Sequence, residues 1–361
     1  MTTPARAAEA DKASVTFHIA LTQIGVATIE DALTLWQGVP PVQTAAISAA
    51  WLRRAIFLVM TRRARSRDLA MAYYRLVRAL RTGRTVADPR KPDPAYVTLG
   101  MLRREFAALA GPAQPAMTVT ARPAATNEPG QPELSPARQP NDQQGDQSTP
   151  DDDEDRVLVE EIEALDREQE RLEREAEDEA RIVLEELGAR NLGRKLADVD
   201  TTAPAVDVDE LRDDAHRRAG TRQAAAAERL VMNGARSAVW STAQRDRRVV
   251  GYARLSRTGT PCGWCAMLIS RGAVYKSQRS AEYADGDKYH DNCHCTAEQV
   301  FTRDQFTGSD LFALNRRYGV LWPQVTKGLS GKAALRAWRR FIRQEQAAAQ
   351  QARRSSNVQE A

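Results

Sequence analysis

The sequence predicts a mainly α-helical protein with a small α+β C-terminal domain. Apolar residues recur at helical spacing along most of the chain, and one segment alternates in the manner of a strand. All four cysteines fall within 34 positions, a clustering typical of residues that converge on one point. With 361 residues and 42% hydrophobic content, the chain is long enough for two or three domains with packed cores.

Residues 1–112 are expected to form a helical N-terminal domain, in which Pro40, Pro41 and Gly83 separate the helices. The positions at helical spacing are Phe17, Leu21, Ile24, Ile29, Leu33, Trp36, Leu52, Ile56, Val59, Leu69, Tyr73, Leu76 and Leu80. A basic girdle in the same region consists of Arg53, Arg54, Arg62, Arg63, Arg65 and Arg67. We interpret this girdle mainly as a solvated helix face, and alternatively as a surface for nucleic acid or an acidic partner.

The middle of the chain changes composition twice. Residues 113–150 have almost no apolar anchors, so we expect a disordered linker. Residues 151–188 are expected to form an acidic coiled-coil-like helix that ends at Gly188. Positions 151–187 hold 18 acidic residues and five arginines, a net charge of −13. Since the overall charge is +4, the rest of the chain carries +17.

The acidic helix carries a narrow seam of apolar residues. Its members are Leu158, Ile162, Leu165, Leu172, Ala176, Ala180, Val183 and Leu187, with Gln169 filling one gap. A seam of this width predicts a partner helix, either in the same chain or in another one. The alternative is a single exposed helix supported by pairs such as Glu163 with Arg167.

After a loop at 198–207, residues 207–305 are expected to form the small α+β domain, and residues 306–361 a basic helical C-terminal region. Within these regions we predict a helix over 208–245, a strand over 247–256, a short helix over 264–269, a short strand over 273–276 and a final helical region over 311–351. In the first strand, Val249, Gly251, Ala253 and Leu255 alternate with Arg248, Val250, Tyr252 and Arg254.

The cysteines follow a spacing that suits a metal ion. Cys262 and Cys265 form a C-x2-C turn, and 24 residues later comes the segment H-x2-C-H-C. Zinc takes four thiolate or imidazole ligands in a tetrahedron, and a C-x2-C turn supplies two of them with little strain. We expect a structural zinc site of Cys262 and Cys265 with Cys293 or Cys295, completed by Cys295 or His290.

Three other interpretations of the cluster stay open. Cys262 and Cys265 could form a redox pair at a helix N-terminus, although this needs a thioredoxin-like βαβ frame. A cysteine nucleophile could pair with His290. The thiols could also form disulfides or be simply buried. The sequence has no phosphate-binding loop, HExxH or GxSxG motif, so it identifies no catalytic residue.

The runs RLSRTGTPCGWCAML at 254–268 and YHDNCHC at 289–295 resemble MuF-type minor head proteins of tailed bacteriophages. The actinobacteriophage versions, which these runs match more closely, are often described as capsid maturation proteases. The resemblance covers about residues 245–305 and implies a MuF-like domain over 207–305. It places the family's cluster on Cys262, Cys265, His290, Cys293 and Cys295, and it gives His294 no family role.

The resemblance also implies a place and partners. Such a protein is made in the host cytoplasm and built into the phage head near the portal, with portal, scaffold and major capsid proteins as partners and possible contact with packaged DNA. The N-terminus lacks the apolar region of a signal peptide, and the most apolar run, 47–60, is interrupted by Arg53 and Arg54. We therefore expect no membrane partner.

Three functional hypotheses follow. We favour a non-enzymatic minor capsid protein that contributes to procapsid assembly and to DNA packaging or ejection. The alternative is a capsid maturation protease that cleaves scaffold or major capsid protein. A third hypothesis is a zinc-dependent nucleic-acid-binding protein, which the arginines interleaved with Trp338 and Phe341 permit.

Overall fold

The computed structural model describes residues 3–41, 45–88, 90, 96–111, 150–199, 205–256, 261–273, 291, 293 and 295–359, without the side chains of 150–166, 205, 349 and 352–359. These residues form two compact units, 1–241 and 242–361. The expected mainly α class with a small α+β part is confirmed. The boundaries expected at 112, 150, 188, 207 and 306 stay predictions.

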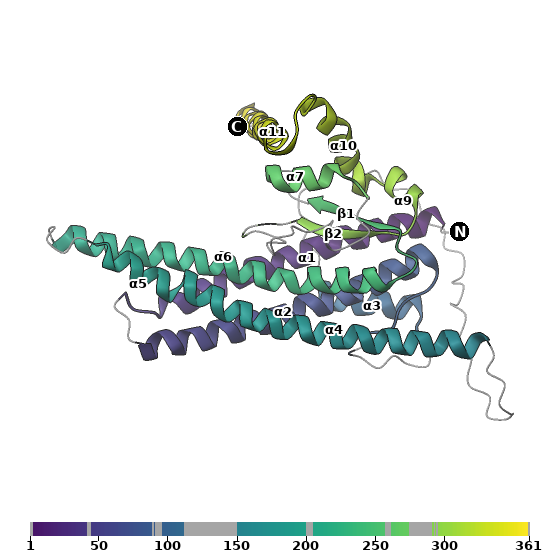
Figure 1. Cartoon of the computed structure of the whole chain (residues 1–361), viewed down its shortest axis with the longest axis horizontal. Coiled ribbons are helices and arrows are strands. Elements are labelled where there is room, and N and C mark those ends of the chain that lie inside the picture. The colour runs from purple at the N-terminus through teal and green to yellow at the C-terminus, as the bar shows by residue number, and fades with distance from the viewer. Residues whose placement is uncertain are drawn as a thin grey trace. The chain divides into compact units, whose positions relative to one another are not determined.

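The first unit is built of helices, of which the longest run roughly lengthwise beside one another (Figure 1). Their bounds are α1 Pro4–Gln37, α2 Ala45–Thr82, α3 Leu99–Ala110, α4 Pro150–Leu187, α5 Ala189–Ala197 and α6 Ala205–Arg245. Thr3 and Thr98 cap α1 and α3 by accepting hydrogen bonds from backbone amides of the first turn. Helices α4 and α6 lie over the segments for which the sequence predicts the acidic helix and the helix at 208–245.

Helix α2 lies at the centre of this unit and packs against α1, α3 and α4. Its buried side chains include Trp51, Tyr73, Tyr74 and Leu80. The Tyr73 ring stacks on Phe17 of α1, with centroids 4.2 Å apart. The apolar residues at helical spacing therefore form a core in which α1, α3 and α4 pack around α2.

Helix α4 finds its partner helix within the same chain. Gln169, Ala176 and Ala180 of its seam are buried, together with Leu184, which the predicted seam does not include, and α4 packs on α2. The small alanines let the two helices approach closely. The partner helix that the seam predicts is therefore present in the same chain. Gln169, the polar member of the seam, is buried with the apolar ones.

Arg63 of α2 joins three helices. Its Nε donates to both carboxylate oxygens of Glu173 in α4, at 3.0 and 3.2 Å, and its Nη1 donates to the Leu230 carbonyl in α6 at 2.9 Å. The side chain is only 4% exposed. Close by, Gly234 lets α6 approach, because an added Cβ would lie 2.6 Å from Arg63 Cγ. A buried guanidinium thus replaces water as the partner of a carboxylate and of a carbonyl.

This arrangement corrects part of the interpretation of the basic girdle. Arg63 and Arg67 are buried, and both contact Glu173, so they are not a solvated face. Arg53, Arg54 and Arg65 are exposed as expected. Helical periodicity could not separate the two groups, because the strip of α2 that α4 covers carries Arg63 and Arg67 beside apolar residues such as Met71.

The second unit combines a two-stranded antiparallel sheet with short helices. Its elements are β1 Gly251–Ser256, α7 Gly263–Ser270, β2 Cys295–Val300, α9 Arg303–Gly308, a 3-10 turn at Asp310–Phe312, α10 Ala313–Val325 and α11 Gly331–Gln359. In the register of the sheet, Gly251 pairs with Val300 and Ser256 with Cys295. Ala253, Leu255, Val300 and Phe312 form an apolar cluster beside the sheet.

The C-terminal elements differ from the predictions in three places. Strand β2 is not among the elements that the sequence predicts, and the predicted final helical region is two helices, α10 and α11. Gly328 and Gly331 adopt positive φ between them, which ends one helix and starts the next. Arg254 was placed on the polar side of the first strand but is buried, because both faces of β1 are covered.

Several predictions lie outside the described residues: the disorder of 113–149, most of the strand at 273–276, and His290 and His294. Among the residues that the structure describes, none of the helices is long and apolar enough to cross a membrane.

The Arg63 contact gives a stability prediction. Arg63→Met should lower the free energy of unfolding of the helical unit by about 2–4 kcal/mol, because Glu173 and the Leu230 carbonyl lose their buried donor. Arg174→Met removes an exposed pair with Glu170 and should cost less than about 0.5 kcal/mol. Urea unfolding followed by circular dichroism compares the two; equal effects would contradict a structural role for Arg63.

Candidate metal centre

Two separate parts of the second unit, the start of α7 and the start of β2, bring the cysteines together. Cys262 is the N-cap of α7, and its sulfur accepts a hydrogen bond from the Cys265 amide at 3.4 Å. Cys265 lies one turn into the same helix, so the two sulfurs share one end of it. Cys293 precedes β2, and Cys295 is its first residue. The β1–β2 pairing holds this second pair in place, since Cys295 is opposite Ser256.

The sulfurs lie at separations that a metal ion requires. The Cys265 and Cys293 sulfurs are 3.6 Å apart, and those of Cys265, Cys293 and Cys295 all lie within 4.8 Å of one another. Tetrahedral zinc with bonds of about 2.3 Å separates its sulfur ligands by about 3.8 Å, whereas a disulfide needs about 2.05 Å. Cys262 packs against these three residues. The thiol cluster, Cys262, Cys265, Cys293 and Cys295, could therefore hold a metal ion.

Contacts between the thiols, together with burial, raise the pKa values of Cys265 and Cys295. Contacts with Cys262, Cys293 and Cys295, in that order, and burial raise the pKa of Cys265 far above its ordinary value. For Cys295, a hydrogen bond with Cys265 lowers the pKa, but the contact with Cys293 and burial outweigh it and raise the pKa to about 12. Without metal the thiols of Cys265 and Cys295 are thus protonated at neutral pH. A metal ion must displace those protons, so its affinity rises with pH.

A buried arginine, which the sequence pattern did not single out, stands beside the thiol cluster. Arg254 of β1 is 3% exposed, and its Nη1 lies 3.7 Å from the Cys265 sulfur as a donor. Asn315 of α10 holds this strand in place by donating to the Arg254 carbonyl at 3.0 Å and to the Ile269 carbonyl at 3.1 Å. A cation at this position offsets the negative charge of metal-bound thiolates and orients one of them.

The glycine inside the C-x2-C turn has a packing role. A Cβ added to Gly263 would lie 2.7 Å from Arg339 Cγ and 3.1 Å from its Cα, so the α11 backbone passes directly over this residue. Gln346 of α11 also donates to the Pro261 carbonyl at 2.9 Å. Helix α11 therefore fixes the turn that presents Cys262.

The four cysteines predicted as ligands lie together, whereas the structure does not describe His290, the fifth candidate, or His294. The sulfurs of Cys265, Cys293 and Cys295 lie close enough together for one ion, and Cys262, which packs against these residues, is the remaining sulfur that a tetrahedral site could use. The choice between Cys295 and His290 as the completing ligand stays a prediction, as does zinc as the metal.

The competing interpretations fare differently. The described strands form an antiparallel pair rather than a parallel βαβ unit, which disfavours the redox pair. The cysteine–histidine nucleophile depends on His290 and lies outside the described residues. The described cysteines are free thiols.

Comparison with known proteins finds one family. A family model described as VG15 protein matches residues 197–320, about a third of the chain, and suggests a phage protein. The matched stretch contains β1, α7 and β2 and therefore the whole thiol cluster. No curated protein and no solved structure matches the chain.

Metal removal tests the site directly. The purified full chain should carry about one equivalent of metal, and a strong chelator should lower the thermal midpoint of the C-terminal unit by roughly 10 °C or more. Cys265→Ser should lose the metal and the chelator response. Thr307→Ala, an exposed change in α9 of the same unit, should keep both. A folded wild-type chain that binds no metal would rule the site out.

Proposed function

We propose that this chain is a non-enzymatic minor head protein of a tailed phage, in which a metal-bound thiol cluster stabilises a small C-terminal unit. The main support for this proposal is the family match over residues 197–320, which suggests a phage protein. The matched residues include the thiol cluster. The same stretch holds the runs that resemble MuF-type minor head proteins. Portal, scaffold and major capsid proteins are the partners that this proposal expects.

The position of the thiol cluster supports a structural role for it. It joins the start of α7 to the start of β2, and α7 in turn packs against β1, α10 and α11. A single cross-link at this point therefore restrains most elements of a unit of modest size. Small domains with limited cores gain stability from such a metal.

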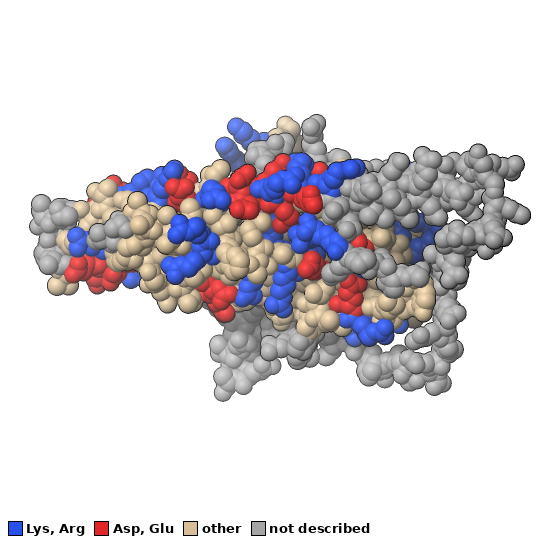
Figure 2. Space-filling model, turned by 90° about the horizontal axis from the view of Figure 1, so that it is seen from below, with Lys and Arg blue, Asp and Glu red and all other residues tan. Residues whose placement is uncertain are grey.

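The aromatic residues of α11 support helix packing rather than nucleic-acid stacking. Trp338 is fully buried, with its ring 5.4 Å from Phe341 and 5.2 Å from Trp322, centroid to centroid. A base needs an exposed ring face to stack on. On the face drawn in Figure 2, basic and acidic side chains alternate rather than forming one positive surface. These observations favour the head-protein hypothesis over the nucleic-acid-binding one.

Co-expression with the portal, scaffold and major capsid proteins of its own genome tests the proposal. The chain should sediment with the assembled procapsids, and Cys265→Ser should reduce its incorporation several-fold while Thr307→Ala does not. We expect this lower incorporation because Cys265→Ser removes the metal that restrains the C-terminal unit.

Mass spectrometry of the same particles tests for protease activity. Scaffold and major capsid proteins should have identical masses with wild type and with Cys262→Ala or His290→Ala. If wild type trims either protein and a folded variant does not, the non-enzymatic proposal is wrong. Absence of the chain from procapsids would contradict it as well.

A further inference from the structure

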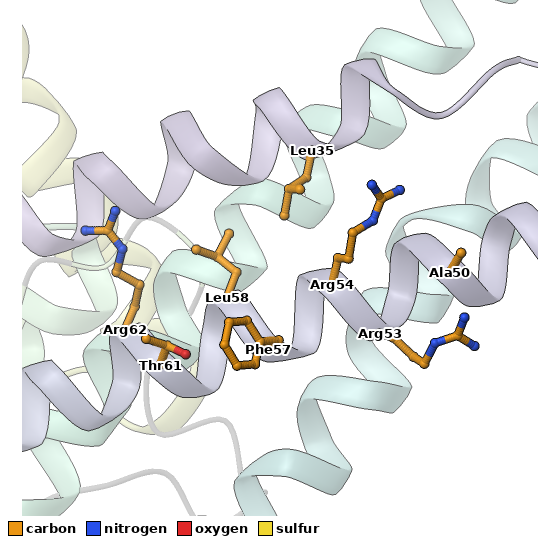
Figure 3. Close-up of a pocket in the computed structure, with 8 residues that line it drawn as sticks. All are labelled: Leu35, Ala50, Arg53, Arg54, Phe57, Leu58, Thr61 and Arg62. Atoms are coloured by element: carbon orange, nitrogen blue, oxygen red, sulfur yellow. The ribbon is translucent and has the colours of Figure 1, made fainter.

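A groove of about 560 Å³ lies between α1 and α2 of the first unit. Figure 3 shows Leu35 of α1 and Leu58 of α2 in its wall, with the guanidinium groups of Arg54 and Arg62 reaching toward α1 on either side of Leu58. Phe57 lies at the edge and is 73% exposed. None of the described residues that line the groove is acidic. It is an apolar surface bordered by cations.

The charges at the groove are only partly matched within the chain. Arg62 pairs with Asp31 of α1. Arg53 and Arg54 are exposed, and neither has an ion-pair partner among the residues that the structure describes. Covering an exposed phenylalanine that lies beside two unmatched arginines is favourable, because the ring leaves water and the cations pair with carboxylates.

The same helix already binds an acidic helix one to three turns further along. Arg63 and Arg67 of α2 contact Glu173, while Ala176 and Ala180 of α4 bury the apolar part of that interface. The groove offers the same combination of arginines and apolar side chains without an occupant from the described residues. Its size admits one or two large side chains rather than a duplex.

We propose that this groove is a docking site for an acidic amphipathic helix of a partner protein, which inserts an aliphatic or aromatic side chain beside Phe57 and Leu58 and places carboxylates on Arg53 and Arg54. The contact belongs to the helix-in-groove class of recognition, with charge setting specificity and association rate. It does not involve the thiol cluster, so it stands or fails apart from the proposed function.

The test uses the full chain and a fluorescent synthetic peptide helix that carries glutamates on one face and leucines with one tryptophan on the other. Wild type should bind it, with affinity falling as salt rises. Phe57→Ala and Arg54→Glu should each weaken binding about tenfold. Two matched controls on exposed positions of α4, Ile182→Ala and Arg174→Glu, should leave it unchanged.

Other outcomes overturn the proposal. Failure of the peptide to bind, or equal losses in the α4 controls, would remove the docking site. If a DNA oligonucleotide binds instead and responds to Arg54→Glu but not to Phe57→Ala, the surface is a nucleic-acid contact. If wild type self-associates in sedimentation velocity and Phe57→Ala abolishes it, the occupant is a second copy of the chain.

Discussion

The C-terminal unit is organised around a thiol cluster that joins two separate parts of its chain. Cys262 and Cys265 lie at one end of α7, and Cys293 and Cys295 lie at the start of β2. Three buried thiols and the partly buried Cys262 gain little from one another as neutral groups, but thiolates hold a metal ion strongly. The supporting residues fit this role: Arg254 supplies a nearby cation, and Gly263 lets α11 close over the turn.

In the N-terminal unit, charged side chains are buried between long helices. The acidic helix α4 is docked within its own chain through Glu173 on Arg63 and Arg67. Buried ion pairs add little net stability compared with apolar contacts, but they define which helix pairs with which and in what register. Part of the acidic segment and part of the basic girdle thus bind each other within the same chain. The part of the basic girdle that remains exposed borders the α1–α2 groove.

Sequence reasoning located the helices and the thiol cluster because both leave local patterns. Helical spacing marked α1, α2 and α6, and the C-x2-C turn marked the start of α7. It missed features that depend on contacts distant along the chain. Arg254 alternates like a solvent-facing strand residue but is covered on its own face, and Arg63 belongs to a girdle whose burial is decided by α4, 110 residues away. Only the tertiary pairing distinguishes such charged residues from their exposed neighbours.

The most direct test of the central claim is X-ray absorption spectroscopy at the zinc edge on the purified full chain. The account predicts about one zinc per chain with a first shell dominated by sulfur at about 2.3 Å, and loss of that shell in Cys265→Ser. A shell with nitrogen replacing one sulfur would identify a histidine as the completing ligand. A shell of oxygen alone, or a folded chain without metal, would contradict the account.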